Sequence, residues 1–217
     1  NDYLRRTGLT RRRFGALGVA MGLAAVLPRA ANALDVNESG VEVRTPDGVA
    51  DCYFVHPASG AHAGVLIWPD ILGLRPAFRR MARRLAESGY AVLVVNPYYR
   101  RQRAPVIPDG ATYAEQSTRD IVMPLYQSLD ARTHVTDAKA FVAWLDDQPA
   151  VDRKRKVGTM GYCMGGPITM RTAAAVPGRV GAAASFHGGG LVTDQPDSPH
   201  LLVPQMKAHY LIAIAEN

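Results

Sequence analysis

KVGTMGYCMGGPITMRTAAAV, residues 156–176, is the stretch that decides the fold. Its first five residues are predicted to form a buried strand, and residues 165–176, which Pro177 and Gly178 follow, are predicted to form a helix. Between them, Gly161 and Gly165 flank Cys163 in the Gly-x-nucleophile-x-Gly pattern of a nucleophile elbow. The turn is so tight that the nucleophile is strained and its neighbours two positions away must lack side chains. We therefore expect the Cys163 thiol at the carboxyl edge of a sheet, where the first amides of the helix favour a thiolate.

The rest of the chain alternates short apolar runs with helix-length segments. This alternation is typical of an α/β fold, a mostly parallel sheet covered by helices on both faces. Residues 41–44 and 50–56 flank a turn-forming Pro-Asp-Gly and predict a hairpin at an antiparallel edge. The other predicted strands are residues 63–68, 91–95, 156–160, 181–186 and 209–215, and the predicted helices are residues 76–88, 134–147 and 165–176. Residues 113–129 are ambiguous and fit a helix over the top of the sheet.

The charge of the chain is unevenly distributed. The 217 residues carry a formal charge of +6, but six arginines and one aspartate place +5 of it in residues 1–33. The remainder is close to neutral and has no electrostatic footprint for nucleic acid.

The first 33 residues have the order of an export signal. Thr10-Arg11-Arg12-Arg13-Phe14 resembles a twin-arginine signal, an uncharged stretch follows, and Ala31-Asn32-Ala33 offers small side chains for cleavage. We predict a signal peptide in residues 1–33 that is cleaved after Ala33, and a single domain in residues 34–217. The mature protein would then be periplasmic or secreted, without a stable membrane anchor. An amphipathic or anchoring helix is the alternative.

Four segments stand out together: GYCMGG at 161–166, WPDILGL at 68–74 followed by RRLAESGY at 83–90, NPYYRR at 96–101, and SFHGGGL at 185–191. In order and spacing they resemble the dienelactone hydrolase (carboxymethylenebutenolidase) family of the α/β-hydrolase superfamily. The resemblance covers about residues 41–217. It implies hydrolysis of a small carboxylate-bearing enol lactone or ester, as in the conversion of a dienelactone to maleylacetate, with Cys163 as nucleophile and with no metal or cofactor.

The resemblance also assigns roles around the nucleophile. The backbone N–H groups of Ile71 and Met164 would form the oxyanion hole. Asp70 stands where several relatives carry a glutamate that pairs with the resting thiol. Aspartate is one methylene shorter, and a loop aspartate that caps the helix at residue 76 or its approach is the alternative.

Two further residues have an open assignment. Arg101 matches an arginine that binds the substrate carboxylate, although Arg100 and Arg103 beside it also suit a solvated stretch. His187 ends a strand beside the elbow, where ligands bind in open α/β sheets, and would line the site. The glycines after His187 equally fit a structural turn.

In the family, the catalytic acid follows the strand predicted at residues 209–215, and the histidine comes one helix and one strand later. The chain is therefore expected to stop short of both, so that this polypeptide would be inactive while its full-length parent is active. Two rival hypotheses remain open. One is a non-catalytic binding protein, and the other is a periplasmic thiol redox protein that uses Cys52 and Cys163.

Overall fold

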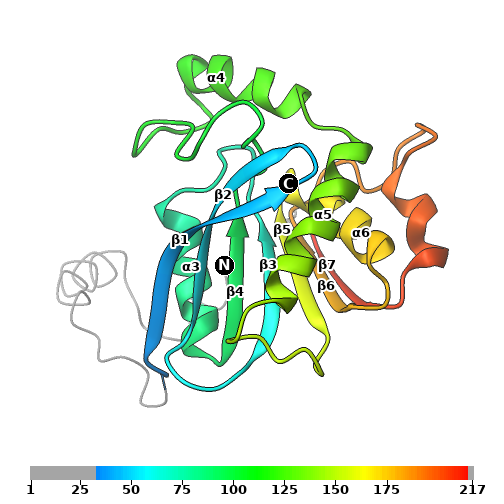
Figure 1. The fold of residues 1–217 in the computed structure, drawn as a ribbon. Helices are drawn as coiled ribbons and strands as arrows, with labels where there is room; N and C mark the ends of the chain where they lie inside the picture. The colour runs from blue at the N-terminus through cyan, green and yellow to red at the C-terminus, as the bar shows by residue number, and fades with distance from the viewer. Residues whose placement is uncertain (1–32, 215–217) are drawn as a thin grey trace, which may run out of the picture. The chain divides into compact units, whose positions relative to one another are not determined.

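The structure, a computed structural model, describes residues 33–214, whose seven strands form one sheet (Figure 1). The strand order is β1-β2-β4-β3-β5-β6-β7. The strands are β1 (Val36–Thr45), β2 (Gly48–Pro57), β3 (Ala63–Trp68), β4 (Tyr90–Val95), β5 (Val157–Tyr162), β6 (Val180–Phe186) and β7 (His209–Ala213). The helices are α3 (Pro76–Glu87), α4 (Gln116–Gln127), α5 (Ala131–Asp146), α6 (Gly165–Ala175) and the 3-10 helix η2 (Pro199–Gln205).

The sheet is parallel except at one end. The hairpin β1–β2 and the pair β2–β4 are antiparallel, whereas β4, β3, β5, β6 and β7 run in one direction. The predicted hairpin and every other predicted strand are present. The signal-peptide prediction lies outside the described residues, apart from Ala33.

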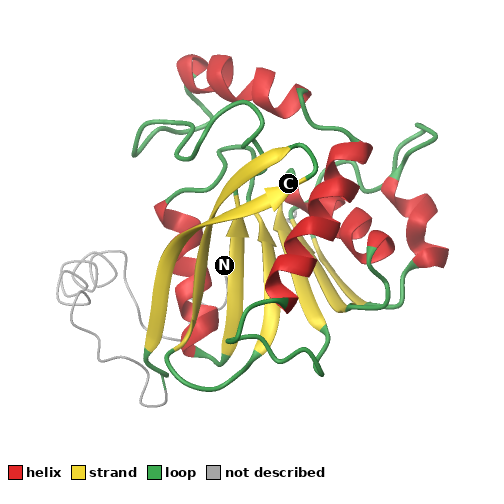
Figure 2. Ribbon diagram, in the orientation of Figure 1, coloured by secondary structure: helices red, strands yellow, loops and turns green. Residues whose placement is uncertain are grey.

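Helices cover both faces of the sheet (Figure 2). Leu93 and Val95 of β4 pack in one apolar layer with Phe141 of α5, and α6 contributes to the same layer. Val92 and Phe78 pack in the layer on the opposite face, which α3 covers. Because β4 is buried on both faces, its sequence is a continuous apolar run and does not alternate. The predicted fold class is confirmed.

Two local features differ from the sequence expectation. Helix α5 begins at Ala131, three residues earlier than predicted, because Asp130 and Thr133 form a reciprocal capping box. The Asp130 carboxylate accepts the Thr133 N–H over 2.6 Å, and the Thr133 hydroxyl oxygen accepts the Asp130 N–H over 2.9 Å. The proline-rich loop after β6 contains the helix η2, which was not predicted.

The parallel strands end at one edge of the sheet. Trp68 pairs with Gly161 and Tyr162 pairs with Phe186, so the chain leaves β3, β5 and β6 at the same level. Helix α4 lies beyond this edge, at the top of Figure 1, as expected for residues 113–129. This register brings the loops that carry the predicted site residues to one edge. Within residues 33–214, no helix combines the length and the apolar character needed to cross a membrane.

Candidate active site

Cys163 occupies the strained turn between β5 and α6. Its φ angle is 51°, in the left-handed region that residues with a β carbon rarely adopt. A β carbon on Gly161 would lie 2.0 Å from the carbonyl oxygen of Gly165, and one on Gly165 would lie 2.3 Å from the carbonyl oxygen of Trp68. The two glycines are therefore required sterically, as the elbow pattern predicts.

Backbone hydrogen bonds fix the orientation of Cys163. Its N–H donates to the carbonyl oxygen of Phe186 over 3.0 Å, and its own carbonyl oxygen accepts the N–H of Gly166 over 3.0 Å. The thiol is partly exposed and makes no disulfide. A partly exposed thiol at the start of a helix has the surroundings of a reactive cysteine.

The two predicted oxyanion donors lie on segments that touch each other. The N–H groups of Ile71 and Met164 donate no hydrogen bond to any residue in the described range 33–214. In the loop after β3, the carbonyl oxygen of Asp70 accepts the N–H of Gly73 over 2.9 Å. In a trans peptide the N–H points away from the C=O, so this bond sets the direction of the Ile71 N–H. Neither amide is engaged within the described part of the chain, and their role as oxyanion donors stays a prediction.

The carboxylate of Asp70 closes this loop through an ion pair. Both of its oxygens accept hydrogen bonds from the Arg75 guanidinium, over 2.7 and 2.8 Å, and one also accepts the Leu72 N–H over 3.0 Å. Helix α3 has no side-chain cap, so Asp70 does not cap it. Its ion pair with Arg75 instead holds the segment that leads into the helix. Within residues 33–214, no hydrogen bond joins Asp70 to Cys163. Its role beside the thiol stays a prediction.

The three arginines after β4 have different partners. Arg100 pairs with buried Asp137 over 2.6 Å and also with Asp47 over 2.7 Å, and Arg103 pairs with Glu42 over 3.0 Å. The Arg101 side chain is exposed and has no ion pair among the described residues. Of the three guanidiniums, that of Arg101 is the one without a carboxylate partner in residues 33–214.

His187 directly follows β6 and, like Cys163, has a backbone conformation in the left-handed region. Its φ angle is 53°, its N–H donates to the carbonyl oxygen of Ala213 over 2.8 Å, and its side chain is exposed. A β carbon on Gly188 would lie 2.3 Å from the Ser185 hydroxyl oxygen, so a larger residue there would require that hydroxyl to move. Phe186, the residue before His187, is hydrogen-bonded to Cys163 through the backbone, whereas the role of the His187 side chain stays a prediction.

Sequence reasoning assigned no role to Tyr98, whose hydroxyl group contacts both segments that carry the predicted oxyanion donors. Its hydroxyl group is 2.9 Å from the carbonyl oxygen of Ile71 and 3.1 Å from the sulfur of Met164. The available signal was its position directly after a central strand, within one of the four segments that resemble the family.

The second cysteine is unlike the first. Cys52 is buried in β2, and this burial raises the pKa of its thiol well above the ordinary value. Both cysteines are free, so the structure offers no disulfide in support of the redox hypothesis.

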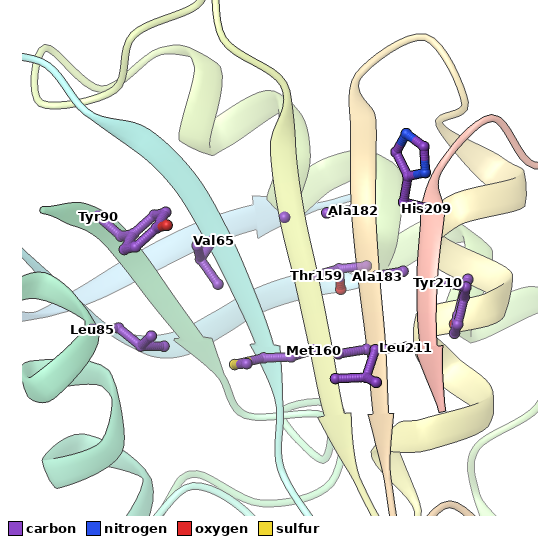
Figure 3. A pocket seen from close by; sticks show the side chains of 12 residues that line it. Val65, Leu85, Tyr90, Thr159, Met160, Ala182, Ala183, His209, Tyr210 and Leu211 are labelled. Atoms are coloured by element: carbon purple, nitrogen blue, oxygen red, sulfur yellow. The ribbon is translucent and has the colours of Figure 1, made fainter. Parts of the chain in front are cut away.

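A groove of about 450 Å³ lies away from Cys163, on the face of the sheet that α3 covers in part (Figure 3). Its walls include Met160 of β5, Ala182 of β6 and Leu211 of β7. They are almost entirely apolar and include neither Cys163 nor an oxyanion residue. The groove therefore has no part in the chemistry considered below.

A family model described as the dienelactone hydrolase family matches residues 50–217. This chain belongs to the dienelactone hydrolase family. The matched range contains the elbow, the loop with Ile71, and the segments after β4 and β6 that carry Arg101 and His187.

Curated relatives agree with the family assignment. The chain is similar to a carboxymethylenebutenolidase of Rhodococcus opacus, with 30% identity over 141 residues, which are 64% of this chain and 50% of that protein. It is 27% identical to a carboxymethylenebutenolidase of Pseudomonas putida over 77% of this chain and 68% of that protein. The alignment thus spans about half the length of the Rhodococcus relative.

Solved structures of the dienelactone hydrolase type share the fold. A dienelactone hydrolase-like promiscuous phosphotriesterase from metagenomic libraries aligns with a TM-score of 0.64 and 23% identity, over 83% of this chain and 69% of that one. The dienelactone hydrolase of Anabaena variabilis aligns with a TM-score of 0.55 and 20% identity, over 83% and 86% of the two chains. At these identities the likeness shows the α/β-hydrolase fold alone.

Proposed function

We propose that this protein is a cysteine hydrolase that cleaves a small carboxylate-bearing enol lactone or ester. One observation carries the proposal: Cys163 sits at a φ angle of 51° in a Gly-x-Cys-x-Gly elbow, and the N–H groups of Ile71 and Met164 donate no hydrogen bond within residues 33–214. The relatives named carboxymethylenebutenolidase support the same reaction class. The proposal concerns the whole protein, since the match covers half of the first relative.

The proposed reaction proceeds in two steps. The Cys163 thiolate attacks the carbonyl carbon, and the electron pair of the C=O bond moves onto its oxygen, where the N–H groups of Ile71 and Met164 would stabilise the negative charge. The ring or ester C–O bond then breaks, and the leaving oxygen takes a proton. Water attacks the resulting thioester, which releases the carboxylic acid and restores the thiol.

This reaction needs a base to collect the thiol proton and an acid to orient that base. In line with the resemblance, we propose that a histidine acts as this base and that a carboxylate orients it. His187 would line the site. We also propose that the protein acts in the periplasm or outside the cell, after cleavage behind Ala33.

We propose that the substrate carries a carboxylate because one guanidinium after β4 has no acidic partner within residues 33–214. Arg100 and Arg103 are engaged by acidic side chains, whereas Arg101 is exposed and has no acidic partner among the described residues. A guanidinium binds a carboxylate bidentately, which would orient a small substrate over Cys163.

The test compares two cysteine variants of the protein expressed from its complete reading frame. We expect Cys163→Ala to lose hydrolysis of p-nitrophenyl acetate by at least about 1000-fold, because the nucleophile is gone. Cys52→Ala is the matched control and should retain the wild-type rate, since Cys52 is buried in β2. Equal rates for wild type and Cys163→Ala would exclude the proposal. Loss in Cys52→Ala together with Cys163→Ala would favour the thiol redox hypothesis.

A further inference from the structure

Tyr98 is held rigidly in the loop that follows β4. Its N–H donates to the side-chain oxygen of Asn96 over 3.0 Å. The Asn96 amide in turn donates to Asp51 and to the carbonyl oxygen of Gln102, each over 2.9 Å. Asn96 and Tyr98 are almost completely buried. The backbone from which the Tyr98 ring extends is therefore held in place.

The hydroxyl group of Tyr98 contacts both segments that carry the oxyanion donors. It donates to the carbonyl oxygen of Ile71 over 2.9 Å and lies 3.1 Å from the sulfur of Met164. A phenol has one proton, and a carbonyl oxygen accepts it better than a thioether does. The hydroxyl proton thus forms its directional hydrogen bond with Ile71, and the sulfur of Met164 is in contact with the hydroxyl oxygen.

The ring of Tyr98 also supports the loop after β3 from below. A β carbon on Gly73 would lie 3.5 Å from two ring carbons, and Gly73 has a φ angle of 74°, which favours glycine. The same Gly73 donates its N–H to Asp70 and so helps to set the direction of the Ile71 N–H. Tyr98 thus contacts the loop at its turn, beside Gly73, and at Ile71 itself, through the carbonyl oxygen of that residue.

Tyr98 keeps its proton across the working range of pH. Burial, first of all, raises the pKa of its hydroxyl well above the ordinary value, and the nearby Asp70, Tyr126 and Cys163 raise it further. The raised pKa keeps the hydroxyl in its protonated form, in which it can donate a hydrogen bond.

We propose that Tyr98 is a positioning residue that fixes the oxyanion hole, because its hydroxyl ties the Ile71 loop to the Met164 end of the elbow. This inference rests on the proposed function. Oxyanion donors accelerate a reaction only when they are fixed before the charge develops, since a donor that must first be ordered loses much of its effect. A single buried hydroxyl that contacts both donor segments meets this requirement.

Tyr98→Phe tests the proposal in the protein expressed from its complete reading frame, because it removes the hydroxyl and keeps the ring. We expect kcat for p-nitrophenyl acetate to fall by about 10-fold to 100-fold, while KM stays within about twofold, because the donors act on the transition state. Tyr99→Phe is the matched control. It removes a neighbouring buried hydroxyl, which donates to Asp137 and not to an oxyanion segment, and it should keep the wild-type kcat.

Backbone hydrogen exchange gives a readout that does not require activity. In Tyr98→Phe, the peptide that covers residues 69–74 should exchange faster than in wild type, and in Tyr99→Phe it should not. If hydrolysis depends on Cys163, a kcat of Tyr98→Phe within threefold of wild type overturns the positioning role. If Cys163→Ala is as active as wild type, the proposed function fails and the role of Tyr98 in the oxyanion hole fails with it. If Cys163→Ala is inactive but exchange in residues 69–74 of Tyr98→Phe is unchanged, the role of Tyr98 alone is overturned.

Discussion

Gly161 and Gly165 meet at the base of the elbow, where a β carbon on the first would lie 2.0 Å from the carbonyl oxygen of the second. The backbone of neither glycine can move easily, because Gly161 belongs to a central strand paired with β3 and Gly165 begins α6. The close approach lets α6 start immediately above β5. It is the contact on which the position of Cys163 depends.

Gly161→Ala should therefore destabilise the protein strongly. The new methyl group must displace the backbone, and we expect the free energy of unfolding to fall by about 3 kcal/mol or more. Gly178→Ala is the control, because a β carbon there meets no atom within 4 Å and should change stability by less than about 0.5 kcal/mol. Urea unfolding of both variants measures the difference. Equal urea midpoints for Gly161→Ala and Gly178→Ala would mean that the backbone of the elbow can move enough to accept a methyl group at position 161.

Variants that break the ion pair between Asp70 and Arg75 distinguish two roles for Asp70. If Asp70 acts by holding the loop of Ile71, then Asp70→Asn and Arg75→Gln should lower kcat by a similar factor, about 3-fold to 30-fold, since either change breaks the pair. If Asp70 instead helps to form the thiolate, only Asp70→Asn should change the pH profile of kcat/KM. Rate measurements from pH 5 to 9 on both variants distinguish the roles. We expect matching profiles.

Arg101 is predicted to select substrates that carry a carboxylate. Arg101→Gln should raise KM about 10-fold or more for a carboxylate-bearing lactone and leave KM for neutral p-nitrophenyl acetate unchanged. Arg103→Gln is the matched control, because Arg103 is a neighbouring exposed arginine already paired with Glu42. A parallel rise in KM for both substrates in Arg101→Gln would point to a general loss of loop structure and not to carboxylate recognition.

His134 is predicted to make stability depend on pH. Burial, together with Arg171 and Arg100, lowers the pKa of this histidine from 6.5 to about 3, against a smaller opposite effect of Asp130. Between these two values the unfolded chain binds one more proton than the folded one. The contribution to stability is therefore complete above pH 6.5 and is lost as pH falls toward 3.

We expect this single group to account for about 2 kcal/mol of the loss in unfolding free energy between pH 7 and pH 5. His134→Leu should remove that part of the pH dependence. At pH 7 it should cost little, because neither ring nitrogen has a hydrogen-bond partner among the described residues. His209→Gln, at an exposed position, is the control and should keep the wild-type dependence. Parallel curves for wild type and His134→Leu would contradict the prediction.

Local sequence patterns predicted much of the fold. The elbow, the hairpin around Asp47 and the central strands depend on residues that are close in sequence: glycines where a β carbon cannot fit, and apolar runs of strand length. The early start of α5 was missed although it is also local, because its capping box has threonine at the third position in place of the usual glutamate or glutamine.

The partners of the site residues were not predictable in the same way. The sequence gives three arginines after β4, but it does not say that Arg100 meets Asp137 while Arg101 stays exposed, because that depends on where α5 packs. Likewise, no spacing along the chain indicates that Tyr98 contacts Met164, which is 66 residues away.

By itself, the sequence determined the α/β class, the strained turn at Cys163 and the segments that would surround it, since steric fit and hydrophobic periodicity act over a few residues. Only the tertiary structure decided that Asp70 binds Arg75, that Arg101 has no acidic partner in the described part of the chain, and that Tyr98 joins Ile71 to Met164. The physical reason is the order of the strands. Because β4, β3 and β5 lie side by side, their carboxyl ends bring together side chains that the chain itself keeps far apart.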